Sequence, residues 1–345
     1  MANKFEEISR LADDAARQIV RNKEEWMKYL DTAARLYRYP FREQRLIYAQ
    51  RPDATACASI GIWNDRMNCW VRRGAKGIAL IDDDASGKNK LKYLFDVSDV
   101  TPGRYNGRLP KLWKMEEKYQ DRVIADLEKI YGSTSRVKTF EGRLDDLAKH
   151  ITADYYEELL PELMSSLNGS FLYGLDDLNV GKRLRETVEN SISYTLLSRC
   201  GCDMKSWKEE LDFDYIHEFN SVDALMILGN AVSELTKPIL MQMGRSINAM
   251  EQELAKEAAR EGISEKSVEI TSKVDYNALK RESEHRDTDH HNSQNGQNIE
   301  GGNGDGINLH SERGLSDPES QSERGTAGAA PEIRGDEETA PAGDL

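Results

Sequence analysis

A break in composition near residue 281 decides which part of this chain can fold. From Arg281 to Leu345 the sequence has no aromatic residue, and these 65 residues hold 10 of the 25 glycines and only 11 hydrophobic residues. So little apolar surface cannot offset the conformational entropy that is lost on ordering a chain. The segment carries a net charge of −10, against −14 for all 345 residues. We therefore expect a disordered acidic tail, rich in Gly, Ser and Asn, over residues 266–345.

Several classes of protein are excluded by simple counts. No apolar stretch approaches the ~20 residues that span a bilayer, and the N-terminus lacks the apolar core of a signal peptide. Cys57 and Cys69 stand twelve positions apart and Cys200 and Cys202 form a C-x-C pair, so neither gives the spacing of a zinc site. The sequence predicts a reduced, cytoplasmic protein without a membrane span.

The first 108 residues predict an α+β domain with a small mixed or antiparallel sheet and flanking helices. Amphipathic periodicity and flanking prolines predict helices over Phe5–Val20, Lys23–Tyr37 and Phe41–Gln50. Short apolar or β-branched runs bounded by glycines predict strands over Ala56–Ile62, Asn68–Val71, Gly77–Ile81 and Leu91–Val97.

Residues 109–265 predict a helical domain. Helical periodicity covers Leu112–Tyr131, Arg143–Ile151, Ala153–Leu167 and Ser221–Arg260. Apolar residues every four positions from Leu184 to Leu196 predict another helix, with Gly201 as its C-cap. Pro238 should bend or restart the helix in which it lies.

Residues 35–77 are basic against an acidic background. They contain nine Arg or Lys and three acidic residues, and six aromatic residues lie among them. Proteins that bind single strands use cations for the phosphates and aromatic rings for the unpaired bases. The same pattern is also consistent with a buried aromatic core under solvated arginines, so composition alone leaves both interpretations open.

The order of residues within this stretch resembles a known family. The run YPFREQRLIYAQRPDAT, residues 39–55, is followed by Trp63 and by VRRGAKGI, residues 71–78. This resembles the ArdC-type antirestriction N-terminal domain, which shows an aromatic residue, Q-x-L-I-x-x-Q-x-P-x-A-T, a Trp and V-x-K-G-x-x-G-I at similar spacings. Arg73 replaces the family's Lys and keeps the charge. The similarity extends over roughly residues 20–105.

The resemblance implies a domain that binds single-stranded DNA and occurs on plasmids, phages and conjugative elements. We expect phosphate contacts from Arg42, Arg45, Arg72, Arg73 and Lys76. The candidates for base stacking, some of which must instead belong to the core, are Tyr39, Phe41, Trp63 and Trp70. Trp63 is the ring that we most expect to be buried, with Leu46 and Ile47 facing inward beside it.

The remaining sequence is similar to the N-terminal part of very large mobile-element proteins of Firmicutes, in which helicase and DNA-methylase domains follow. The similar segments are LRETVENSISYTLLSRCG, WKEELDFDYIHEFN and LGNAVSELTKPIL. Neither a Walker A motif nor an N-P-P-Y motif is present here. The resemblance implies a stand-alone or truncated version, with such modules or conjugation proteins of the same element as partners.

The sequence predicts no enzyme, no cofactor and no metal site. ArdC proteins often carry a zincin-like peptidase, but the nearest match here is His217-Glu218-Phe219-Asn220-Ser221, in which Ser replaces the second His. Glu186 and Glu189 lie on a segment that resembles the peptidase helix supplying a third zinc ligand, but without the His pair there is no metal for them to bind. The region could therefore be a degenerate peptidase. We expect the thiols of Cys200 and Cys202 to be inert, the acids at 82–84 to be solvated, and the tail histidines to bind no metal.

Two other functions stay open. The helical domain and acidic tail could form a protein-interaction module, which would bind a basic partner or mimic DNA. A protein that mimics DNA needs acidic residues spaced along a folded surface, whereas most of the excess negative charge here lies in the tail. This argues against DNA mimicry but not against binding of a basic partner. The chain could also be a fragment of a larger protein with no activity of its own.

Overall fold

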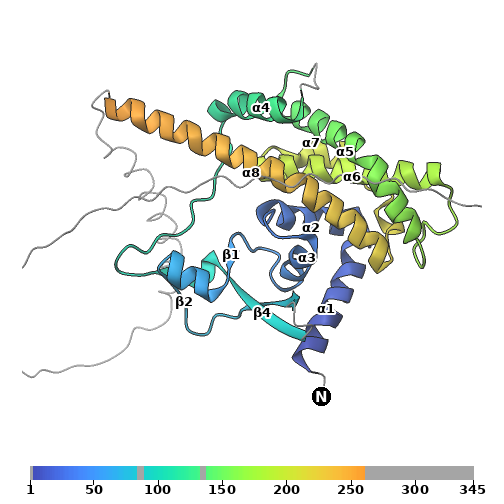
Figure 1. Ribbon diagram of the computed structural model, residues 1–345, viewed down its shortest axis with the longest axis horizontal. Coiled ribbons are helices and arrows are strands. Elements are labelled where there is room, and N and C mark those ends of the chain that lie inside the picture. Colours follow the sequence, from blue (N-terminus) through green and yellow to red (C-terminus); the bar gives the residue numbers. More distant parts are fainter. Residues whose placement is uncertain (1–2, 84–88, 133–136, 261–345) are drawn as a thin grey trace, which may run out of the picture. The chain divides into compact units, whose positions relative to one another are not determined.

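The computed structural model describes residues 3–83, 89–132 and 137–260, and the predicted tail over 266–345 lies outside them. The described part is mostly helical, with small antiparallel sheets near the N-terminus (Figure 1), which confirms the predicted fold class. Its α-helices are α1 (Lys4–Ile19), α2 (Lys23–Arg35), α3 (Phe41–Gln50), α4 (Glu117–Tyr131), α5 (Phe140–Ser165), α6 (Asp177–Cys200), α7 (Met204–Glu210) and α8 (Val222–Arg260). Its strands are β1 (Cys57–Ala58), β2 (Cys69–Val71), β3 (Ile78–Asp83), β4 (Asn89–Asp96) and β5 (Val100–Pro102).

Local sequence signals account for several helix ends. Asn3 caps α1 by accepting a hydrogen bond from the Phe5 N–H, and the Glu6 carboxylate accepts one from the Asn3 N–H. The prolines on either side of α3 give it the predicted bounds. Gly201 ends α6 with a φ of 72°, a left-handed conformation that glycine adopts without strain, so the predicted C-cap is confirmed.

The structure differs from the predictions in several places. Strand β1 has only two residues, because the chain enters a helical turn at Ile60, where the predicted strand would continue. A π-helical turn, Ile62–Arg66, follows it. The two helices expected between residues 143 and 167 form the single helix α5, and α8 runs through Pro238 without restarting. Strand β5 was not predicted at all.

The strands form two antiparallel groups. Strand β4 lies between β1 and β3, and β2 pairs separately with β5. One buried cluster joins the first group to α1 and α3 and includes Ile8, Leu46, Ile47, Leu80 and Leu94. Leu46 and Ile47 therefore face inward, as predicted, but Trp63 belongs to a separate buried cluster with Cys69 and Val100.

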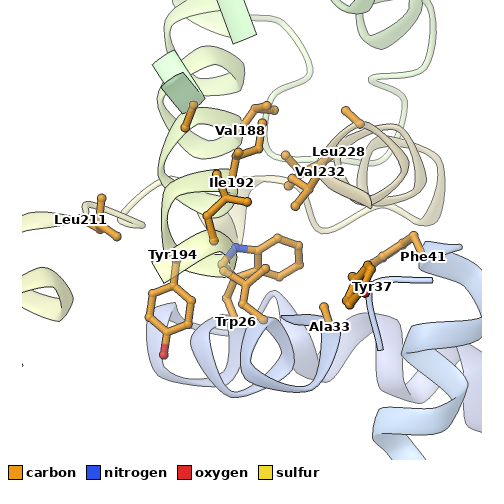
Figure 2. Packing of buried hydrophobic residues seen from close by; sticks show 14 of the residues in the cluster. Trp26, Ala33, Tyr37, Phe41, Val188, Ile192, Tyr194, Leu211, Leu228 and Val232 are labelled. Carbon is orange, nitrogen blue, oxygen red and sulfur yellow. The ribbon is translucent and has the colours of Figure 1, made fainter. Parts of the chain in front are cut away.

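The largest buried cluster joins α2 to the later helices (Figure 2). Trp26 of α2 lies at its centre, and its indole N–H donates a hydrogen bond to Ser191 Oγ at 2.9 Å. Side chains from α6 and α8 surround this ring, among them Val188, Ile192, Leu228 and Val232. Both predicted domains contribute to this core, and the boundary at residue 108 stays a prediction.

Helix α8 is long, with 39 residues, but polar and charged residues recur among its apolar residues. Over the ranges that the structure describes, no helix is apolar enough along a sufficient length to cross a membrane.

Candidate nucleic-acid interface

The β2–β5 ribbon brings two basic segments together. Its register pairs Cys69 with Pro102, Trp70 with Thr101 and Val71 with Val100. Beyond the strands, the Gly103 N–H donates to the carbonyl of Asn68 at 2.8 Å. Residues 67–72 therefore lie beside residues 99–108, with Arg66, Arg73 and Lys76 flanking the paired residues in the chain, although the chain between the two segments forms β3 and β4.

The loop after β5 is held against Asn68 by further contacts. The Arg108 N–H donates to the Met67 carbonyl at 3.0 Å, and the Asn68 side-chain amide donates to the Tyr105 carbonyl. Two glycines allow this close approach. A Cβ at Gly103 would lie 2.8 Å from the Asn68 carbonyl oxygen, and one at Gly107 would lie 2.4 Å from the Gly103 nitrogen. The loop therefore requires glycine at both positions.

The paired segments and the residues that flank them present six exposed cations and two exposed aromatic rings. We name this set the ribbon cluster; it consists of Arg66, Trp70, Arg72, Arg73, Lys76, Arg104, Tyr105 and Arg108. The Trp70 side chain is 55% exposed and Tyr105 is 82% exposed. Large rings at such exposure contribute little to a core and can stack on a ligand.

The electrostatics of the ribbon cluster favour an anionic ligand. Within the described residues, none of its six cations forms an ion pair. Residues 100–114 contain four cations and no acidic residue. The nearby Asp99 is already paired with Arg51, with 2.5 Å between Oδ2 and Nη1. The cluster can therefore neutralise phosphates without first breaking internal ion pairs.

The residues that carry the family resemblance mostly hold the scaffold together. The Gln50 side chain donates to the Ala79 carbonyl at 2.8 Å and accepts from the Ala79 N–H at 2.9 Å, which ties α3 to β3. The Gln44 side chain accepts from the Tyr29 hydroxyl at 2.8 Å. Trp63 is buried, as predicted, and its indole N–H donates to the Phe95 carbonyl at 2.9 Å.

A buried carboxylate fixes the segment that leads into β1. Asp96 accepts hydrogen bonds from the backbone N–H groups of Thr55 at 2.7 Å and Ala56 at 3.0 Å, and from both the N–H and the hydroxyl of Ser98. Burial alone would raise the pKa of Asp96, but these donors outweigh it and the pKa is lowered. Asp96 therefore stays ionised at neutral pH.

The structure separates the predicted DNA-binding residues into two groups. Trp70, Arg72, Arg73 and Lys76 are exposed and belong to the ribbon cluster. Arg42 lies half-buried on α3 and already has an interaction within the chain.

Two of the predicted contacts are wrong, and a third is restricted. Phe41 is 0% exposed, because its ring packs against Gly229 of α8, so it cannot stack on a base. Arg45 is 6% exposed, with its guanidinium over the Phe41 ring, and cannot reach a phosphate. Tyr39 is half-buried, and its hydroxyl donates to the Cys57 carbonyl at 2.5 Å.

Three residues of the ribbon cluster were not predicted from the sequence: Arg104, Tyr105 and Arg108. They lie outside the basic stretch over residues 35–77, and only the pairing with β2 brings them to it. One signal was present: residues 103–108, GRYNGR, combine two arginines, a tyrosine and two turn-forming glycines without an acid.

Other chemistry that the sequence suggested is not assembled here. His217 Nδ1 lies 2.8 Å from the Asp214 carbonyl, and the described residues contain no group of three or more potential metal ligands. Burial raises the pKa of the Cys57 thiol to about 12 and that of Cys202 to about 11, so neither is a thiolate at neutral pH. Burial also raises the pKa of Glu189. Asp84 and the four histidines of the tail lie outside the described residues.

Comparison with models of protein families, with curated proteins and with solved structures finds nothing that matches this chain. The resemblance to the ArdC-type domain therefore stays a prediction.

Proposed function

We propose that this chain binds single-stranded DNA without strong sequence preference, through the ribbon cluster. The observation that carries the proposal is the pairing of β2 with β5, which places six cations without ion pairs in the described part of the chain beside two exposed rings. Phosphates would meet the cations, and unpaired bases would stack on Trp70 and Tyr105. A duplex keeps its bases stacked inside and offers no free faces to these rings.

The biological role that we propose is non-catalytic. A cytoplasmic protein of a mobile genetic element would coat or shield single-stranded DNA during transfer, as the resemblance to the ArdC-type domain implies. Helicase or methylase modules, or conjugation proteins of the same element, would be its partners.

The test is a titration of the full-length chain against a fluorescently labelled single strand, followed by anisotropy. Matching duplex serves as the competitor, and the titration is repeated between about 50 and 200 mM salt. We expect strand-selective binding that weakens steeply as salt rises. Equal competition by duplex, or no binding at the lowest salt by a chain whose helical circular dichroism is intact, would contradict the proposal.

One observation favours a second candidate, a protein-interaction module. Three large apolar side chains within eight residues, at the junction of α5 and α6, are exposed: Phe171, Tyr173 and Leu178. Exposed apolar residues that cluster in this way are typical of a protein-interaction site. Substituting all three with Ser should leave DNA binding unchanged. If the chain does not bind single strands, a pull-down from cells that carry the element becomes the test. A protein that the wild-type chain captures and the triple variant does not would support the interaction module instead.

A further inference from the structure

A pocket of about 410 Å³, which shares no lining residue with the ribbon cluster, lies between α2, the segment before α4 and the end of α6. Its polar lining comes from Asp31, Arg35, Lys114, Ser198 and Arg199. The volume falls in the range of roughly 300–1,000 Å³ that is typical of small-molecule sites.

Arg199 is a half-buried cation without a carboxylate. Its guanidinium lies 3.5 Å from the centre of the Trp113 ring, and one nitrogen donates to the Trp113 carbonyl at 2.9 Å. Among the described residues it forms no ion pair, and burial lowers its pKa while leaving it charged. The Trp113 and Tyr37 rings and this carbonyl compensate part of the charge, and the other guanidinium N–H groups have no partner within the described ranges and can donate to an anion.

Lys114 strengthens this charge. It is exposed at the pocket, and across the described ranges its ammonium has neither a hydrogen bond nor an ion pair. Arg35 adds a third cation, but its donors are used by the carbonyls of Pro52 and Ala54. Arg35 and Arg199 lie in the last turns of α2 and α6, where a cation also offsets the helix dipole. Lys114 lies on no helix, so the dipole does not account for it.

Asp31 is the one acid in the lining, and one of its two carboxylate oxygens already accepts hydrogen bonds within the protein. Its Oδ1 accepts hydrogen bonds from the hydroxyls of Tyr194 at 3.1 Å and Ser198 at 2.9 Å. Three cations and one carboxylate leave the lining with two positive charges. This balance matches the dianion of a phosphate monoester, and Asp31 offers an acceptor to a hydroxyl or amino group beside that phosphate.

We propose that this pocket binds a phosphate monoester of mononucleotide size. Lys114 and Arg199 hold the phosphate, and the remaining volume takes the sugar and base. The monoester comes either from a free nucleotide or from the 5′ end of a DNA strand. The site does not depend on the ribbon cluster, so it stands whether or not that cluster binds DNA.

Calorimetric titration of the full-length chain with deoxyadenosine 5′-monophosphate tests the proposal. We expect one site, with weaker binding of inorganic phosphate and none of deoxyadenosine. Lys114→Gln should weaken binding about tenfold, because one charged contact is lost. Asp31→Asn should tighten it several-fold by removing the negative charge while keeping an acceptor for Tyr194.

Lys118→Gln is the matched control. This lysine is exposed, pairs with Glu116 and does not line the pocket, so its loss should change affinity by less than about twofold. Equal losses in the two lysine variants would overturn the proposal, and so would the absence of binding by both the nucleotide and inorganic phosphate.

Oligonucleotides of one sequence, with a 5′-phosphate or a 5′-hydroxyl, separate the two sources of the monoester. A preference for the phosphorylated strand that Lys114→Gln abolishes would identify the strand end. Nucleotide binding without that preference would identify a free nucleotide. A chain with substitutions in the ribbon cluster should keep its affinity for the nucleotide, which distinguishes failure of this site from failure of the proposed DNA interface.

Discussion

The ring of Phe41 on α3 packs directly over the backbone of Gly229 on α8. A Cβ built at Gly229 would lie 2.4 Å from two atoms of the ring, closer than side chains pack. This contact joins the helix that carries the basic motif to α8, the longest helix in the described ranges. It also explains why Phe41 is unavailable to a ligand.

Gly229→Ala should destabilise the protein. The added methyl group must displace a ring that is 0% exposed, and such overpacking costs about 1–3 kcal/mol, which exceeds the gain in helix propensity. Denaturant unfolding monitored by circular dichroism measures the difference. Gly61→Ala is the control, since the nearest atom to its added Cβ is 3.7 Å away. An unchanged midpoint in the Gly229 variant would show that the ring can move freely.

Replacement of Arg45 by Met tests the assignment of this arginine to the interior. Its Nε and Nη1 are buried without a hydrogen-bond partner, and burial lowers its pKa. Removing a charge held at such a cost should leave the free energy of unfolding unchanged or raise it by up to about 2 kcal/mol. Affinity for single-stranded DNA should not change. A clear loss of affinity with an intact fold would show that Arg45 does contact the DNA.

The hydrogen bonds to Asp96 should make stability depend on acidic pH. The pKa of Asp96 is lowered in the folded chain, so its contribution is complete above the unfolded value of about 3.9 and is lost as pH falls through the folded value. Asp96→Asn should cost about 1–3 kcal/mol at pH 7, because its amide group cannot accept from the Ser98 donors. The two proteins should converge in stability only as pH falls through this lowered pKa of Asp96. A difference that stays constant with pH would exclude the carboxylate as its source.

Removal of three ribbon cations should flatten the salt dependence of DNA binding. In the variant with Arg72, Arg73 and Lys76 all changed to Ala, the slope of log affinity against log salt should fall by roughly 0.7 for each lost phosphate contact. The matched control removes Arg17, Lys129 and Lys182, which are equally charged and exposed but are paired with acids on their own helices. If both variants show the same slope, only net charge matters and the location of the interface is wrong.

Trp70→Ala and Tyr105→Ala should each weaken single-strand binding by about 1–3 kcal/mol without changing stability. Both rings are exposed, so their loss leaves no cavity. Tyr173→Ala removes another exposed ring far along the chain and serves as the comparison. Anisotropy measures the affinity for DNA and thermal unfolding measures stability, so the two measurements together separate a loss of binding from a loss of stability. Loss of stability in either variant would indicate a structural role for that ring.

The elements that the sequence predicts well are those with strong local signals. Helix α3 lies between Pro40 and Pro52, and α6 ends at a glycine that must adopt a left-handed conformation. Strand β5 has no such signal, since it has three residues and includes a proline, and it forms only because β2 pairs with it.

The candidate site was predictable only on one side of the ribbon. Arg72, Arg73 and Lys76 stand next to a glycine turn in a recognisable motif, whereas Arg104 and Arg108 join them through backbone pairing between distant segments. Burial of Phe41 was equally hidden, because helical periodicity cannot identify Gly229 as its neighbour.

The pair of hydrogen bonds between Gln50 and Ala79 has a consequence for self-association. Strand β3 is the last strand on its side of the three-stranded sheet. At Ala79 the Gln50 amide occupies the donor and acceptor that an incoming strand would use. A single side chain thus takes the place of a further strand, and it blocks the register in which a second molecule could add to this edge and begin an aggregate.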